Sequence, residues 1–235
     1  MTDLHTHILP GMDDGARSAE ESIALLRAQR DQGVRRVALT PHFYPRQEGV
    51  EDFLSRRKRS WETLQRAMDA LGGERETLPE LTLGAEVAWQ GGGRWEQLDV
   101  LRIGDQGPVL VELPFQNWGG TMLRELYNLI CRSEAPVVLA HLDRYLKDQK
   151  KEYIREICAM GVPIQLGADR LEGFWSRREM LALLRREFPF FLASDCHNLT
   201  TRPPCMGQAA ERIEKALGTA AAKKILTRSD ALFSL

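Results

Sequence analysis

Every histidine of this chain stands at or just beyond the carboxyl end of a short apolar run. Such runs are typical of buried strands. Helical patterns separate them along the chain, which favours βαβ units and a mostly parallel sheet. Because the carboxyl ends of parallel strands meet at one edge, we expect the imidazoles to gather there in a single polar centre. The five histidines are His5, His7, His42, His141 and His197.

The segment pattern predicts an α/β fold. Strands are expected over 1–7, 34–40, 81–87, 109–113, 136–140, 163–166 and 190–193, and helices over 18–32, 50–71, 122–132, 150–160, 177–187 and 207–217, with a short helix after the last and weak structure around Gly91-Gly92-Gly93. About seven such units without a low-complexity linker predict one domain over residues 1–235, folded as a closed or nearly closed (β/α) barrel. An open doubly wound sheet is the alternative.

The spacing of the histidines indicates metal binding. His5 and His7 are two residues apart, so on a strand both side chains point to the same face. Two imidazoles on one face can bind the same ion at about 2.1 Å. A lone buried histidine is more often a hydrogen-bonded core residue, but a second one beside it makes that interpretation harder. Asp195 and His197 repeat the same spacing.

Carboxylates accompany these histidines. Asp13-Asp14-Gly15 follows the first pair, and we favour Asp14 over Asp13 as a ligand, with an Asx turn as the alternative. Glu86 and Glu112 lie within apolar strands, where a carboxylate is unfavourable unless it is paired or metal-bound. An ion pair with Arg102 is the alternative for one of them.

Together these residues form a set of nine nitrogen and oxygen donors without a thiolate. Such a set suits Mn²⁺, Fe²⁺, Zn²⁺ or Mg²⁺, and it exceeds what a single ion takes, so two or three ions are expected. The set consists of His5, His7, Asp14, His42, Glu86, Glu112, His141, Asp195 and His197.

Two arginines lie in loops on the same side as these donors. Arg144 follows His141 by three residues, and Arg202 follows His197 by five. A guanidinium fork there could hold phosphate oxygens, with a surface ion pair as the alternative. Cys196 lies between two donors but points to the opposite face of the strand, so we expect a small core residue and not a nucleophile.

Composition and charge narrow the function classes. The chain has 235 residues, 43% hydrophobic and 28% charged, with a net charge of −1, so neither nucleic-acid binding nor membrane insertion is indicated. The basic clusters Arg56-Arg57-Lys58-Arg59 and Arg177-Arg178 are interpreted as solvated helix faces, with docking of an acidic partner as the alternative. Four cysteines without metal-site spacing and the lack of a leader sequence predict reduced thiols and a cytoplasmic location.

Several strings of the chain resemble the PHP (polymerase and histidinol phosphatase) superfamily, and above all its branch of bacterial manganese-dependent protein-tyrosine phosphatases associated with capsule and exopolysaccharide synthesis. The resemblance covers nearly the whole chain in the same order. The strings are His5-Thr6-His7-Ile8-Leu9-Pro10-Gly11-Met12-Asp13-Asp14-Gly15-Ala16, Thr40-Pro41-His42, Glu112-Leu113-Pro114, His141-Leu142-Asp143-Arg144-Tyr145 and 194–204, Ser-Asp-Cys-His-Asn-Leu-Thr-Thr-Arg-Pro-Pro.

This resemblance implies a distorted (β/α)7 TIM-like barrel, a single PHP metallophosphatase domain over 1–235, and three metal ions, with Mn²⁺ expected. It implies one ion held by His5, His7, Glu86 and Asp195, a second by Asp14, His42 and His197, and a third by Glu86, Glu112 and His141. Arg144 and Arg202 match arginines that look like phosphate binders in the family.

The expected activity is that of a metal-dependent phosphotyrosine-protein phosphatase, acting on a phosphorylated bacterial tyrosine kinase. A metal-bridging hydroxide would attack phosphorus, while Arg144 and Arg202 neutralise the developing charge. Asp143 or a free histidine could supply a proton, and no phosphocysteine is expected. The alternatives are a phosphatase of small phosphomonoesters such as histidinol phosphate, a DNA-processing nuclease of the superfamily, and a non-catalytic metal-bearing partner of the kinase.

Overall fold

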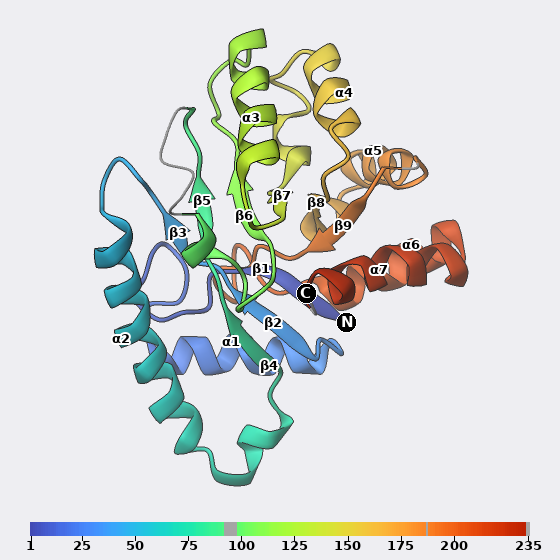
Figure 1. The fold of residues 1–235 in the computed structure, drawn as a ribbon. Coiled ribbons are helices and arrows are strands. Elements are labelled where there is room, and N and C mark those ends of the chain that lie inside the picture. Colours follow the sequence, from blue (N-terminus) through green and yellow to red (C-terminus); the bar gives the residue numbers. More distant parts are fainter. Residues whose placement is uncertain (92–97, 187, 234–235) are drawn as a thin grey trace.

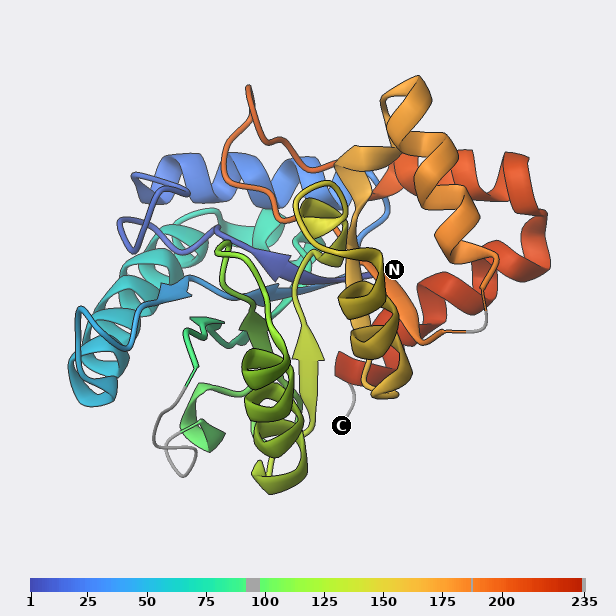
Figure 2. The ribbon, with the colours of Figure 1, turned by 90° about the horizontal axis from the view of Figure 1, so that it is seen from above.

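The computed structural model describes residues 1–91, 98–186 and 188–233 of the chain. Helices surround the strands in both views of the fold (Figures 1 and 2). The strands are β1 (Thr2–Thr6), β2 (Arg36–Leu39), β3 (His42–Phe43), β4 (Glu80–Leu83), β5 (Glu86–Ala88), β6 (Val109–Glu112), β7 (Val137–Leu139), β8 (Ile164–Gly167) and β9 (Phe190–Ala193). The α-helices are α1 (Ala19–Asp31), α2 (Val50–Asp69), α3 (Gly120–Arg132), α4 (Lys151–Ala159), α5 (Phe174–Leu184), α6 (Met206–Leu217) and α7 (Thr219–Phe233).

All of the paired strands run parallel, in two hydrogen-bonded sheets. Their orders are β1-β2-β4 and β3-β5-β6-β7-β8-β9. The two sheets continue into each other, because β2 leads directly into β3 through Thr40-Pro41, and β4 leads into β5 through Gly84-Ala85. Backbone hydrogen bonds bridge these breaks, including Gly84 N to Leu39 O at 2.9 Å and Glu86 N to Pro41 O at 3.0 Å.

The strand order returns to its beginning at β9. Asp195 N donates to His5 O at 2.9 Å, His7 N donates to Cys196 O at 2.9 Å, and Thr6 forms an isolated parallel bridge with Cys196. The buried Asp3 carboxylate accepts a hydrogen bond from Ser194 N at 2.9 Å, which further connects β1 to the segment after β9. The order is the one expected for a distorted (β/α)7 barrel, and the two ends of the order are joined by these contacts and not by a continuous ladder. It confirms the expected parallel α/β fold and differs from an open doubly wound sheet.

A bulge in β1 decides which side chains face the barrel interior. Asp3 pairs with Val37 and Thr6 with Leu39, so Leu4 and His5 together stand opposite the single residue Ala38. A bulge redirects side chains relative to strict alternation. Leu4 packs with Ala38 and other residues of the interior cluster, while His5 reaches the polar centre. Thus the interior holds an apolar layer and, toward the carboxyl ends of the strands, the polar centre.

A local sequence signal accounts for the start of α1. The hydroxyl of Ser18 accepts a hydrogen bond from Glu21 N at 3.3 Å and caps α1. Two helices differ from expectation. α5 starts three residues before the predicted Arg177 and ends at Leu184, three residues before the predicted Glu187, which lies outside the described residues, as do Gly92 and Gly93. α7 was expected to be short but spans 15 residues and packs against β1 and β9.

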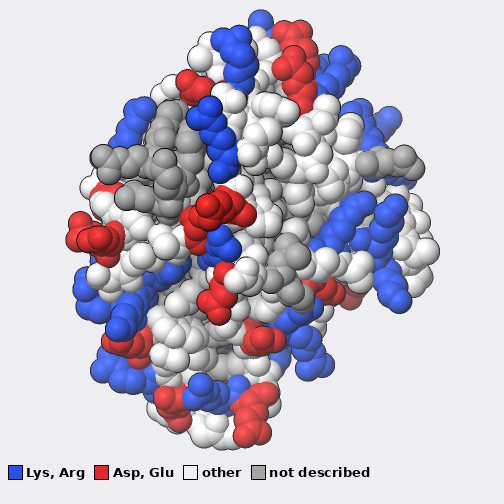
Figure 3. Space-filling model, in the orientation of Figure 1, with Lys and Arg blue, Asp and Glu red and all other residues white. Residues whose placement is uncertain are grey.

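The surface carries both signs of charge. On the face shown in Figure 3, basic and acidic side chains are interspersed, in keeping with a net charge of −1. Among the described residues, no helix combines the length and the apolar character needed to cross a bilayer.

Gly15 is predicted to be essential for packing under the first histidine pair. A Cβ atom there would lie 2.1 Å from His7 O and 2.5 Å from His7 Cβ. We expect Gly15→Ala to lower the free energy of unfolding by about 1–3 kcal/mol, as overpacking does. At Gly73 an added Cβ meets no atom within 4 Å, so Gly73→Ala should stay within about 1 kcal/mol of the parent chain. Denaturant titration measures both, and equal effects would refute this packing argument.

Candidate metal centre

Four donor atoms converge at the carboxyl end of the barrel. Nε2 of His5 lies 3.0 Å from Nε2 of His7 and 3.1 Å from Oε2 of Glu86. Nε2 of His7 lies 3.3 Å from Oε2 of Glu86 and 3.3 Å from Oδ1 of Asp195. Atoms bound to one ion at about 2.1 Å stand about 3.0–3.4 Å apart, depending on the angle. These four atoms therefore have the spacing of ligands to a shared ion.

Hydrogen bonds on the far side of each ring set the orientation of this pair. Nδ1 of His5 lies 2.7 Å from Oε1 of Gln165, and Nδ1 of His7 lies 2.7 Å from Oδ2 of Asp13. Both oxygens accept, so each Nδ1 donates and leaves the Nε2 lone pair aimed at the centre. Such partners are typical of metal-binding histidines.

Asp13 and Asp14 have different surroundings. The Asp13 carboxylate also accepts from Gly15 N at 3.0 Å and His42 N at 2.8 Å. Oδ1 of Asp14 lies 3.2 Å from Nε2 of His197 and 3.7 Å from Nε2 of His42. Asp14 thus belongs to a second cluster of donors, together with His42, His197 and His7, while Asp13 supports His7 from behind.

Glu86 connects the donors into one network. Its Oε1 lies 2.8 Å from Nε2 of His141, and its Oε2 lies 2.9 Å from Nδ1 of His42. Oε1 of Glu112 lies 3.4 Å from Nε2 of the same His141. The structure therefore brings together all nine sequence-predicted donors, and Glu86 stands between the groups.

Burial and charge make this network suited to cations. Oε2 of Glu86 and Oδ1 of Asp195 are buried without a hydrogen-bond partner among the described residues. Burial raises the pKa of Glu86, but His5, His141 and His42 outweigh it and hold that pKa well below its usual range. Buried charged oxygens without donors are unfavourable unless a cation is present, so the residues fit divalent ions.

Two donors sit on an unusual backbone. His141 has φ of 26° and Asp195 has φ of 53°, and these are the only non-glycine residues with positive φ in the described ranges. Both follow strands, β7 and β9. Left-handed conformations of this kind are costly and cluster at functional sites. Here they turn the chain immediately after each strand, so that both side chains point into the centre.

Both predicted arginines reach the centre. Nη2 of Arg202 donates to Oδ2 of Asp195 at 2.6 Å, and Nη2 of Arg144 donates to the same oxygen. Nη1 of Arg202 lies 2.7 Å from Nε2 of His197. Arg144 and Arg202 also line a cavity of about 980 Å³ that opens onto Asp14, His42 and Glu112.

Aromatic residues also line this cavity. Tyr44 follows β3 and stacks on His42, with ring centroids 5.2 Å apart. Phe115 follows β6, is 61% exposed, and lies 6.4 Å from the His141 ring at 21°. Trp89, from the end of β5, lies between them in the strand order and also lines the cavity.

The remaining predicted residues lie outside this set of contacts. Asp143 is buried, and its carboxylate accepts from Gly167 N at 2.8 Å, so its role as a proton donor stays a prediction. Burial raises the pKa of Cys196 to about 12, as expected for a core thiol. Arg102 pairs with Asp99 at 3.0 Å and with neither Glu86 nor Glu112.

The sequence analysis did not identify Gln165 or the aromatic residues that line the cavity. It also did not predict the supporting role of Asp13. Gln165 had the same signal as Glu86, a polar side chain within an apolar strand. Phe115 and Tyr44 gave no such signal, because an aromatic residue after a strand is ordinary in a core.

Comparison with known proteins agrees with this geometry. The family described as capsular polysaccharide synthesis, CpsB/CapC, matches residues 1–232. The tyrosine-protein phosphatase CpsB of Streptococcus pneumoniae is 30% identical over 243 residues, covering 96% of this chain and 94% of CpsB. The tyrosine-protein phosphatase YwqE of Bacillus subtilis (strain 168) is 28% identical, covering 93% and 86%.

The fold is also that of solved relatives. A crystal structure from work on YwqE of Bacillus subtilis and CpsB of Streptococcus pneumoniae, described as metal-dependent tyrosine phosphatases, superposes with a TM-score of 0.80 at 23% identity. The match covers 100% of this chain and 94% of the other. From the length and identity of these matches, the chain belongs to the CpsB/CapC family of capsular polysaccharide synthesis proteins.

Proposed function

We propose that this chain is a metal-dependent phosphotyrosine-protein phosphatase, a phosphoric monoester hydrolase. The observation that carries the proposal is the lining of the cavity. Arg144 and Arg202 line it beside the donor network, and so do the aromatic residues Tyr44, Trp89 and Phe115. An aryl phosphate has the complementary shape, with a charged phosphoryl group at one end and a flat ring at the other.

Nine donors would hold three divalent ions, with Mn²⁺ as the native metal. His5, His7, Glu86 and Asp195 would hold the first, supported by their mutual spacing of 3.0–3.4 Å. Asp14, His42 and His197 would hold the second, and Glu86, Glu112 and His141 the third, supported by the contacts of each group. When bound, such ions would supply positive charge and lower the pKa of a bound water molecule toward neutrality, so that hydroxide is available at neutral pH.

The arginines would bind the phosphoryl oxygens. Both guanidinium groups converge on one oxygen of Asp195, at the cavity side of the donor network. A planar guanidinium can donate two parallel hydrogen bonds to phosphate. Held there, Arg144 and Arg202 would stabilise the charge that grows on the phosphoryl oxygens during hydrolysis.

The aromatic residues would orient the tyrosine ring. Phe115 and Tyr44 lie over different donor groups, His141 and His42 respectively. Offset stacking on such rings favours an aryl ester over an alkyl ester. Because a phenolate leaves readily, we expect little need for a proton from Asp143.

The biological setting is part of the same proposal. CpsB and YwqE are named tyrosine-protein phosphatases, which supports a phosphorylated bacterial tyrosine kinase as the substrate and a role in capsule or exopolysaccharide synthesis. The match to residues 1–232 supports one PHP metallophosphatase domain over 1–235. The cytoplasmic location stays a prediction.

Turnover tests the proposal directly. Metal-stripped protein should release no phosphate from a phosphotyrosine peptide, and Mn²⁺ should restore release. Asp195→Asn should lower kcat/KM by about 100-fold or more, because it removes the charge of a carboxylate whose Oδ1 faces His5 and His7 and whose Oδ2 accepts from both arginines. Asp105→Asn, at an exposed carboxylate, serves as the control. Phosphate release from histidinol phosphate alone would move the function to small phosphomonoesters, and absence of any turnover would favour a non-catalytic role.

Phe115→Ala tests the aromatic lining of the cavity. We expect kcat/KM for a phosphotyrosine peptide to fall by about three- to tenfold, with little change for the matching phosphoserine peptide. Phe115→Tyr should retain the preference. Tyr127→Ala removes another exposed ring, one outside the cavity lining, and should change neither rate. An unchanged ratio of the two rates in Phe115→Ala would contradict the assignment.

A further inference from the structure

A groove is lined by residues of α4 and α5 and by the turn that follows Arg144. Two hollows of about 500 and 300 Å³ form it, with Glu179 and Ala182 in the walls of both. Leu146 and Lys147 line it just after the turn that carries Arg144 into the metal cavity. We call it the α4–α5 groove.

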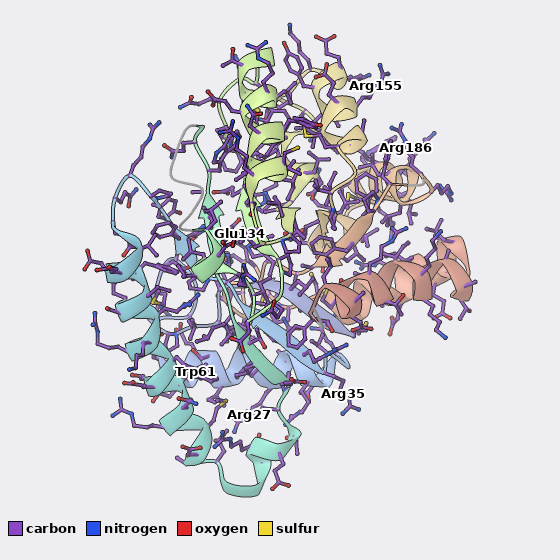
Figure 4. The ribbon with its side chains drawn as sticks, in the orientation of Figure 1. Arg27, Arg35, Trp61, Glu134, Arg155 and Arg186 are labelled. Atoms are coloured by element: carbon purple, nitrogen blue, oxygen red, sulfur yellow. The ribbon has the colours of Figure 1, made fainter. Side chains whose placement is uncertain are left out.

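The charge of the α4–α5 groove is strongly one-sided. Six cations line it against the single carboxylate of Glu179, and they are Lys147, Lys151, Arg155, Arg170, Arg178 and Arg186. Arg170 lies 3.9 Å from Glu179 and 3.7 Å from Asp143. The other five make no ion pair with a carboxylate in the described part of the chain. Figure 4 shows Arg155 on α4 and Arg186 just beyond α5 at the same edge of the molecule.

Two exposed aromatic side chains stand at the start of α5. Trp175 is 75% exposed and Phe174 is 65% exposed, more than any other large apolar side chain in the described ranges. Their rings meet edge to face, with centroids 5.2 Å apart, and Trp175 lines the groove. Tryptophan beside arginine is the composition of binding hot spots. The sequence predicts a solvated helix face at Arg177-Arg178, but such a face does not account for the two exposed aromatic rings of Phe174 and Trp175 beside it.

We propose that the α4–α5 groove binds an acidic peptide segment flanking the phosphotyrosine of a protein substrate. This inference rests on the proposed function. An extended peptide advances about 3.3 Å per residue, so residues a few positions from the phosphotyrosine extend past the cavity rim, where Lys147 lies three residues from Arg144. Glutamate or aspartate side chains there complement the cations that make no ion pair in the described ranges, and Trp175 packs on the peptide.

Paired peptides and paired variants test the groove. The peptides carry one phosphotyrosine and either three flanking glutamates or three glutamines. For the wild-type protein we expect kcat/KM to favour the glutamate peptide by about tenfold at low salt, from three screened charge pairs. Arg155→Glu combined with Arg178→Glu should abolish the preference, and Trp175→Ala should weaken binding of both peptides. Turnover of 4-nitrophenyl phosphate should stay unchanged, which shows that these variants fold with an intact centre.

The matched control reverses two exposed charges elsewhere, Lys58→Glu with Arg59→Glu on α2, and should keep the preference. A wild-type protein without the preference, or a groove variant that retains it, would overturn the proposal. The proposal would also be overturned if the groove variant lost binding to phosphatidylserine vesicles but kept its peptide preference, because that result assigns the groove to a membrane.

If no phosphotyrosine peptide is turned over, the proposed function fails. Anisotropy of a labelled, unphosphorylated glutamate peptide then decides the groove: binding that the variant loses supports it, and no binding overturns it.

Discussion

The buried carboxylate of Glu86 is the constraint on which the centre depends. It has no exposed surface and lies within 3.3 Å of nitrogen atoms from His5, His7, His42 and His141. Removing a carboxylate from water carries an effective penalty of several kcal/mol unless charge compensates it. Histidines compensate only when they are protonated, and they bind metal only when they are not. Divalent ions resolve this conflict, since they neutralise the carboxylates and use the imidazoles as neutral ligands.

Irregular backbone aims the side chains at this point. The bulge at Leu4 and His5 turns the first histidine inward, and breaks after Leu39 and Leu83 divide two strand paths just before His42 and Glu86. Positive φ at His141 and Asp195 turns two further loops. Each irregularity is locally unfavourable, and the buried apolar layer below stabilises the barrel enough to hold it.

Sequence alone predicted much of this arrangement because spacing and burial are simple signals. His5 and His7 share a face, and Glu86 within an apolar strand needs a partner. The bulge at Leu4 and His5 could not be predicted, since it depends on register with β2. Neither could the orienting contact of Asp13, because adjacent carboxylates look alike before the loop folds. The α4–α5 groove could not be predicted either, since its cations are scattered from Lys147 to Arg186 and come to line one groove only in the folded chain.

Metal content measured after gel filtration in Mn²⁺ tests the shared role of Glu86 most directly. Glu86 contacts donors of all three groups and is assigned as a ligand in two of them, whereas His197 is assigned to one. We expect three ions per wild-type chain, one ion lost from His197→Ala, and two lost from Glu86→Gln, with both variants still folded by circular dichroism. Equal losses in the two variants, or full occupancy in Glu86→Gln, would contradict the account of a network built around one bridging carboxylate.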